Sequence, residues 1–152
     1  MISFEDGSEG AYIGNVHEQT GERCAADPRA VLSRVLEAAQ AEFGFTFTIG
    51  PEHEFFLLAE SEDGLARHSD RAGYFRTAPH DRGEAVRQRI VETLAGAGIV
   101  FEKSHHEVTP SQHEINLAPI APLAGADRTV LFNYITQRIA AQHGLYATFM
   151  PK

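Results

Sequence analysis

Two strand-like segments joined by a very short turn limit the fold of this chain more narrowly than any other feature. The first segment covers 99–108, the second covers 112–118, and Thr109-Pro110-Ser111 separates them. A connection this short can join only antiparallel neighbours, because parallel strands need a crossover of about a dozen residues or more. We therefore predict an antiparallel sheet built around this hairpin.

Three segments with apolar residues at helical spacing are predicted to be helices, over 28–43, 82–97 and 127–143. Asp27 and Asp127 are placed as capping residues of the first and third helices, and Gly44 is placed to end the first. Two further strands are predicted where β-branched and aromatic residues gather, over 45–58 and 145–150. Residues 59–80 are polar and are predicted to be a loop. Helices that alternate with antiparallel strands in this order indicate an α+β fold.

Charge and composition argue against several classes of function. The net charge of −8 at pH 7 disfavours a nucleic-acid partner, because phosphate binding needs clustered Lys and Arg. No apolar run approaches the ~18 residues of a membrane span, and the acidic start lacks the apolar stretch of a secretory signal. We therefore expect a cytoplasmic protein without a membrane partner. Cys24 is the sole cysteine, so no disulfide framework can form within one chain.

The first candidate site lies on the strand predicted over 45–58. Glu52 and Glu54 are two residues apart, so their side chains project from the same face of a strand. Ionised carboxylates at the mouth of a core are costly unless a positive charge compensates them. Two interpretations stay open for this pair: a cation site, or an edge strand whose face is solvated.

The hairpin carries a second group of acids, interleaved with histidines. Glu107 and Glu114 flank the turn and come within reach of one ion if both face the same side of the sheet. Clustered carboxylates on strands suit Mg²⁺ or Mn²⁺, whereas structural zinc favours cysteine or a helically spaced His pair. His53, His105 and His113 are interpreted as packing or surface residues that alternate away from the neighbouring Glu.

Three longer stretches resemble glutamine synthetases of the bacterial and archaeal type: GPEHEFFLL at 50–58, EKSHHEVTPSQHEI at 102–115 and HGLYATFMPK at 143–152. A GYF sequence at 73–75 lies between them and is similar to one in that family. The resemblance implies that 27–152 is the N-terminal portion of a glutamine synthetase catalytic domain, with a curved antiparallel sheet covered by helices. Residues 1–26 are then expected to be a remnant of the N-terminal domain or a linker.

The resemblance also implies roles for particular residues. Glu52 is expected to help hold a metal ion near the ATP phosphates, and Glu102 is expected to contact the nucleotide. A second ion, near glutamate and ammonia, is expected to be held by three carboxylates, those of Glu54, Glu107 and Glu114. Glu107 is also expected to take part in catalysis, together with Tyr74, whose counterpart in the family lies by the ammonium pocket.

The implied reaction is the Mg²⁺- or Mn²⁺-dependent synthesis of glutamine from glutamate, ammonia and ATP, through γ-glutamyl phosphate, by a homo-oligomer. Two alternatives stay open: a ligase of the same family that uses another amine, and a non-catalytic remnant that binds metal or modulates assembly. The segment that follows ATFMPK in the family supplies further metal ligands and phosphate-binding arginines. The 152 residues contain no counterpart of it, so we expect this chain alone to be inactive, with an unpaired apolar sheet edge at 145–150.

Overall fold

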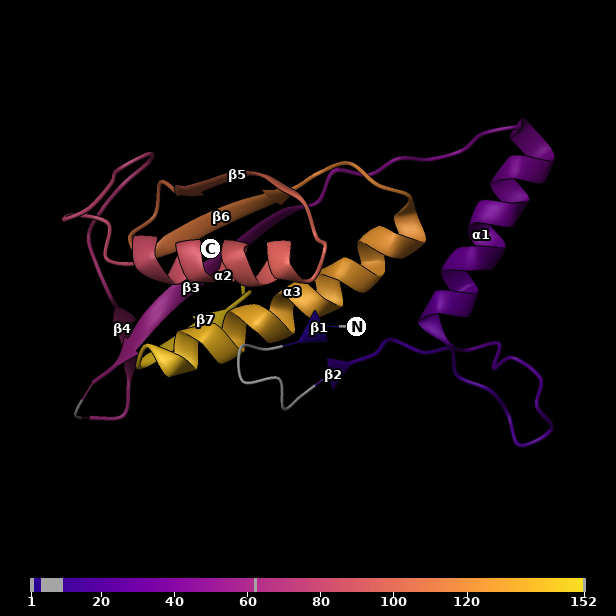
Figure 1. Ribbon diagram of the computed structural model, residues 1–152, viewed down its shortest axis with the longest axis horizontal. Helices are drawn as coiled ribbons and strands as arrows, with labels where there is room; N and C mark the ends of the chain where they lie inside the picture. Colours follow the sequence, from indigo (N-terminus) through magenta and orange to yellow (C-terminus); the bar gives the residue numbers. More distant parts are fainter. Residues whose placement is uncertain (1, 4–9, 62, 152) are drawn as a thin grey trace.

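The computed structural model describes residues 2–3, 10–61 and 63–151, and its main body is an antiparallel sheet with two helices packed on one face (Figure 1). The helices are α1 (Pro28–Phe43), α2 (Glu84–Gly96) and α3 (Pro122–Gln142). The sheet contains β3 (Glu52–Glu60), β4 (Ala66–His68), β5 (Phe101–His106), β6 (Gln112–Leu117) and β7 (Leu145–Thr148). A separate two-stranded ladder joins β1 (Ile2–Ser3) and β2 (Gly10–Ala11).

Every strand pair in the large sheet is antiparallel, as the short hairpin turn predicts. The strands run in the order β4-β3-β6-β5, and β7 pairs with β3 as well. Leu58 of β3 has a partner in both β4 and β7, so these two strands lie on opposite sides of β3. β7 is therefore an edge strand, and within the described residues it pairs with β3 alone. The α+β fold class is confirmed.

The core lies between the sheet and the helices α2 and α3. Strand alternation sends Phe55 and Leu57 of β3 to this side, together with Ile115 and Leu117 of β6, and all four are at most 1% exposed. The helices contribute a matching set of buried side chains: Val86, Ile90 and Leu94 from α2, and Phe132, Ile135 and Ile139 from α3. Each such side chain contributes roughly 1.5–3 kcal/mol when fully buried, so this layer fixes the sheet on which the candidate site is built.

The first helix is confirmed at both ends, and α2 occupies nearly its predicted span. The Asp27 carboxylate accepts the Arg29 N–H at 3.2 Å, and Gly44 ends α1 with a left-handed φ of 71°. The third helix begins at Pro122 rather than at 127, because a proline in the first turn fixes a helical φ and needs no donor there. Asp127 is therefore not a cap; it lies inside α3 and accepts two hydrogen bonds from Arg29 at 2.8 and 2.9 Å. Among the described residues, none of the helices is long and apolar enough to cross a membrane.

The strand predicted over 45–58 begins later, at Glu52. Residues 45–50 are exposed and link α1 to the sheet, with one bridge between Ile49 and Ile120. Pro51 lacks an N–H and cannot donate to a ladder, which accounts for the late start. The strand β4 falls within the predicted loop, and because its three residues are all exposed it has no apolar alternation that could have revealed it.

Candidate metal centre

The two faces of the sheet carry different chemistry. The face beneath α2 and α3, which we call the covered face, holds the apolar core (Figure 1). The opposite face, which we call the open face, presents Glu52 and Glu54 of β3. The register pairs Glu54 with Glu114 on β6, and Glu114 with His105 on β5. Three polar side chains thus form a row across the middle of the open face.

A cluster of three side chains forms where this row meets the hairpin: His105, Glu107 and Glu114, the open-face cluster. One ligand atom of each lies within 4.8 Å of the ligand atoms of the other two. His105 Nδ1 is 3.6 Å from Glu107 Oε1, and His105 Nε2 is 3.8 Å from Glu114 Oε2. The hairpin therefore brings the two glutamates together on one face, which was the condition for their sharing an ion.

The two carboxylates of the open-face cluster are largely shielded from water: Glu107 is 7% exposed and Glu114 is 9% exposed. Burial raises the pKa of Glu114; the Asn116 amide, which donates to Glu114 Oε1 at 2.8 Å, lowers this pKa, and the adjacent Glu107 carboxylate raises it. Within the described residues, His105 is the one basic side chain that contacts either carboxylate. Two adjacent carboxylates with a single imidazole leave negative charge that a cation would offset.

The donor set of the open-face cluster fits a divalent cation. Carboxylate oxygens are the ligands that Mg²⁺ and Mn²⁺ favour, and an imidazole is an accepted ligand for transition metals. One carboxylate is also oriented by the backbone, since the Val108 N–H donates to Glu107 Oε2 at 3.0 Å. A carboxylate held this way needs little rearrangement to receive an ion.

Three other acids that the sequence singled out lie outside this cluster. Glu54 stands opposite Glu114 on the open face, but its exposed carboxylate accepts a hydrogen bond from the Gln112 side-chain amide. Glu52 is exposed one step further along β3. Glu102 is exposed at the irregularity near the start of β5. The structure therefore brings Glu107 and Glu114 together, sets Glu54 beside them, and leaves Glu52 and Glu102 apart.

The loop that carries Tyr74 reaches the open-face cluster from the side. The Tyr74 ring, 57% exposed, has its centroid 5.5 Å from that of His105, and the Phe75 ring stacks on His105 at 4.6 Å. Phe75 has a φ of 58°, a strained conformation for a bulky residue, and its N–H donates to the His106 carbonyl at 3.0 Å. Strain of this kind persists only where the surroundings hold it, so the two aromatic rings form a fixed wall beside His105.

Sequence reasoning missed two members of this neighbourhood, His105 and Phe75. His53 and His113 face the covered side, away from the adjacent glutamates, as predicted. The predicted alternation is wrong for His105, because it lies two residues before Glu107 and shares its face. The spacing of two on a strand was the signal that could have found it.

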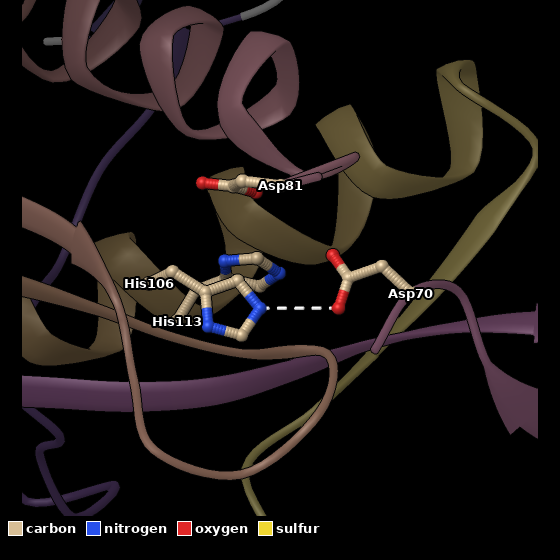
Figure 2. A group of neighbouring side chains, drawn as sticks. All are labelled: Asp70, Asp81, His106 and His113. Carbon is tan, nitrogen blue, oxygen red and sulfur yellow. Dashed lines mark hydrogen bonds and ion pairs between the residues drawn. The ribbon is translucent and has the colours of Figure 1, made fainter. Parts of the chain in front are cut away.

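A second group of titratable side chains is buried on the other side of the hairpin strands: Asp70, Asp81, His106 and His113 (Figure 2). By residue type it also resembles a metal site. However, the Arg87 guanidinium already supplies a cation there, donating to Asp81 at 2.6 Å and to His113 Nδ1 at 2.8 Å. Burial first, and then the charges of Arg87 and His106, lower the pKa of His113 to about 3, so this ring is neutral and accepts from Arg87. We call these four residues and Arg87 the covered-face network.

Comparisons with known proteins identify what this sheet is similar to. A family model described as "Glutamine synthetase, catalytic domain" matches residues 25–152. The glutamine synthetase of Halobacterium salinarum is 41% identical over 149 residues, which cover 97% of this chain and 33% of that protein. The glutamine synthetase of Thermus thermophilus is 43% identical over 143 residues, which cover 92% of this chain and 32% of that protein. The chain thus spans about a third of the length of these relatives.

Solved structures give the same result for the fold. A glutamine synthetase of Plasmodium falciparum superposes with a TM-score of 0.77 at 26% identity, covering 91% of this chain and 33% of that one. A protein named GmaS, solved with ADP, superposes with a TM-score of 0.78 at 31% identity, covering 91% of this chain and 32% of that one. The arrangement of sheet and helices is therefore shared with both.

Proposed function

The chain belongs to the glutamine synthetase family, and on that premise we propose that its open face forms the metal-binding side of a glutamine synthetase-type active site. The proposed reaction joins ammonia to glutamate with ATP, through γ-glutamyl phosphate, in a homo-oligomer. These residues supply one part of that machinery. Divalent ions, when bound, would neutralise the transferring phosphoryl group and orient the glutamate carboxylate.

One observation carries the proposal: two largely buried carboxylates, Glu107 and Glu114, face each other with His105 as their sole basic contact among the described residues. Two such carboxylates destabilise the protein when no cation lies between them, and they are stabilised by a bound cation. The raised pKa of Glu114 has burial as its first cause, which is the signature of a carboxylate held out of water. Perturbed groups of this kind gather at functional sites.

Each residue then has a defined task. Glu107 and Glu114, with Glu54 beside them, hold one ion, and Glu52 contributes to the second ion near the nucleotide. Glu102 contacts the nucleotide from its exposed position on β5. The Tyr74 ring forms the side of the pocket that receives ammonia and helps to exclude water, which would compete for the activated carboxyl group.

A metal titration of the protein tests the proposal. We expect calorimetry with Mn²⁺ to detect one dominant site, and Glu107→Gln to weaken it at least about tenfold, because the variant removes a charged ligand and keeps the shape of the side chain. Glu92→Gln is the matched control, since Glu92 is an exposed acid on α2 that pairs with Arg89. Equal Mn²⁺ affinity of Glu107→Gln and the wild-type protein would contradict the proposal.

A second candidate is a ligase of the same family that joins glutamate to another amine. The likeness to GmaS is compatible with it, and the likeness to the Plasmodium falciparum enzyme has nearly the same TM-score, so neither candidate is favoured by overall shape. An assay with glutamate, ATP and equal concentrations of ammonia and a primary amine separates them, because the mass of the product identifies the amine used. Metal binding without any product would favour the non-catalytic alternative.

A further inference from the structure

One buried carboxylate, that of Asp70, collects hydrogen bonds from four separate places in the chain. Its Oδ1 accepts from the Ala72 N–H at 3.2 Å, the Ser111 N–H at 3.0 Å and His106 Nε2 at 3.1 Å. Its Oδ2 accepts from the Arg82 N–H at 3.1 Å. The loop that carries Asp70, the turn that precedes α2, the end of β5 and the hairpin turn therefore meet at a single side chain. Figure 2 shows the carboxylate directed at the His106 ring.

Two of these partners flank the segment that carries Glu107. His106 precedes it, and the second ring nitrogen of His106, Nδ1, lies 2.6 Å from the Glu107 carbonyl oxygen. Ser111 closes the turn with a φ of 62°, and its Oγ accepts the Asp70 N–H at 3.1 Å. The Glu107 N–H donates to the Gln112 carbonyl at 2.7 Å, which closes the loop between the two anchors. Asp70 thus holds both ends of the turn from which Glu107 projects.

Burial makes this attachment rigid. Asp70 is 6% exposed, and His106 and Ser111 are 0% exposed. A buried donor or acceptor that loses its partner costs about 1–3 kcal/mol, and more when the group is charged. Any shift of the turn relative to Asp70 would leave several such buried groups without their hydrogen-bond partners at once. The turn therefore has one preferred position, and so have the Glu107 and Glu114 side chains on either side of it.

We propose that Asp70 is a positioning residue for the open-face cluster, fixing Glu107 and Glu114 at the separation that receives a divalent cation. This inference rests on the proposed function of the open face. Asp70 does not touch the cluster; it acts through His106 and Ser111, whose neighbours in sequence carry the ligands. Partners of this kind, one shell behind the metal ligands, change metal affinity about 10–100-fold when they are altered.

The test compares Asp70→Asn with Asp63→Asn. The second variant is a matched control, because Asp63 lies in the turn between β3 and β4 and pairs with Arg67 at the surface. We expect Asp70→Asn to lower Mn²⁺ affinity about 10–100-fold, at a temperature where circular dichroism shows it folded, and Asp63→Asn to leave that affinity unchanged. We also expect faster hydrogen exchange at the Ser111 amide of metal-free Asp70→Asn, since this amide donates to Asp70.

The outcomes separate this inference from the proposed function. If the wild-type protein binds no Mn²⁺, the proposed function fails, and the exchange rate of the Ser111 amide alone decides whether Asp70 holds the turn. If the wild-type protein binds Mn²⁺ and folded Asp70→Asn binds it within twofold, the positioning role is overturned. Should Asp70→Asn not fold, Ser111→Ala replaces it, because it removes the hydroxyl that accepts the Asp70 N–H and keeps the backbone. An unchanged Mn²⁺ affinity in folded Ser111→Ala would equally overturn the role.

Discussion

The covered and open faces of the sheet bury charged groups in opposite ways. On the covered face, each carboxylate has a donor: Asp81 is paired with Arg87, and Asp70 receives four hydrogen bonds. On the open face, Glu107 and Glu114 lie side by side, and the Glu107 carboxylate adds to burial in raising the pKa of Glu114. Both groups are built against the hairpin strands, through His106 and His113 on the covered face and through His105 and Glu114 on the open face, and they differ in the partners that surround them.

Charge balance distinguishes the covered-face network, which is structural, from the open-face cluster, which is a candidate binding site. Both groups were composed of His and acidic side chains whose ligand atoms lie within 4.8 Å of one another. Residue type alone would therefore have ranked the covered-face network, with its two histidines, as the better metal site. The guanidinium of Arg87 reverses that ranking, because a second cation beside it would be repelled.

We expect the largest effect from a substitution that removes the positive charge of the covered-face network. Arg87→Met leaves the Asp81 carboxylate buried without its ion pair, and removing one partner of a buried pair typically costs about 3–5 kcal/mol. We expect the free energy of unfolding, measured with urea, to fall by that amount. Arg89→Met is the control on the same helix, since Arg89 pairs with Glu92 nearer the surface and such pairs contribute about 1 kcal/mol or less. A loss below about 1 kcal/mol in Arg87→Met would show that the pair is not what stabilises this face.

We expect the next largest effect from acidification, which lowers stability through the buried histidines of the covered face. The pKa of His113 is lowered to about 3 and that of His53 to about 4, in both cases first by burial, from a usual value of 6.5. The unfolded chain therefore takes up protons as the pH falls from 6.5 toward 4 while the folded chain does not, so stability is present above pH 6.5 and is lost below it. We expect the free energy of unfolding, measured with urea, to fall by about 3 kcal/mol for each of the two histidines between pH 7 and pH 4.

His53→Gln is the control for this pH dependence, because it removes one of the two lowered groups and should make the loss smaller. Glu114 works in the opposite direction, since its raised pKa lets the folded chain bind a proton more readily than the unfolded chain. A stability that is constant or rises toward pH 4 would mean that the open face, and not the covered face, dominates the response.

The smallest expected effect concerns the open face itself. Glu114→Gln removes one of two facing carboxylates and keeps an oxygen that can accept from Asn116. In metal-free buffer we expect it to raise the free energy of unfolding by about 1 kcal/mol, because a charge that is disfavoured by burial is gone. Thermal melts with saturating Mn²⁺ should reverse the order and favour the wild-type protein. If the variant is less stable in both conditions, Glu114 has a structural role that outweighs its repulsion by Glu107.

The sequence predicted those parts of the molecule that local patterns control. The turn at Thr109-Pro110-Ser111 implied the antiparallel hairpin, and the caps Asp27 and Gly44 located α1 correctly. The placement of Glu107 and Glu114 followed from the same turn. The metal-binding roles of Glu107, Glu114, Glu52 and Glu54 stay predictions, and so do the nucleotide contact of Glu102 and the catalytic roles of Glu107 and Tyr74.

The covered-face network could not be predicted, because its contacts join residues far apart in the chain. Asp70 lies in a polar stretch with no periodicity, 36 residues from His106 and 41 from Ser111. Nothing in the local sequence indicates that such a side chain is buried. The early start of α3 was missed for a related reason: its first turn carries no apolar stripe, and Pro122 alone marks it.

The helix α1 stands apart from the two layers of the core, and this has a consequence for how the chain opens (Figure 1). It buries a single residue, Ala30, and it is tied to α3 through the ion pair of Arg29 with Asp127. Its link to the sheet, residues 45–50, is exposed throughout. Its other apolar side chains are half-buried or exposed, so local opening of α1 exposes little further apolar surface, and this helix and the sheet are separate cooperative units. The amides of α1 would exchange with deuterium through local fluctuations, whereas those of β3 and β6 would exchange only when the whole core unfolds.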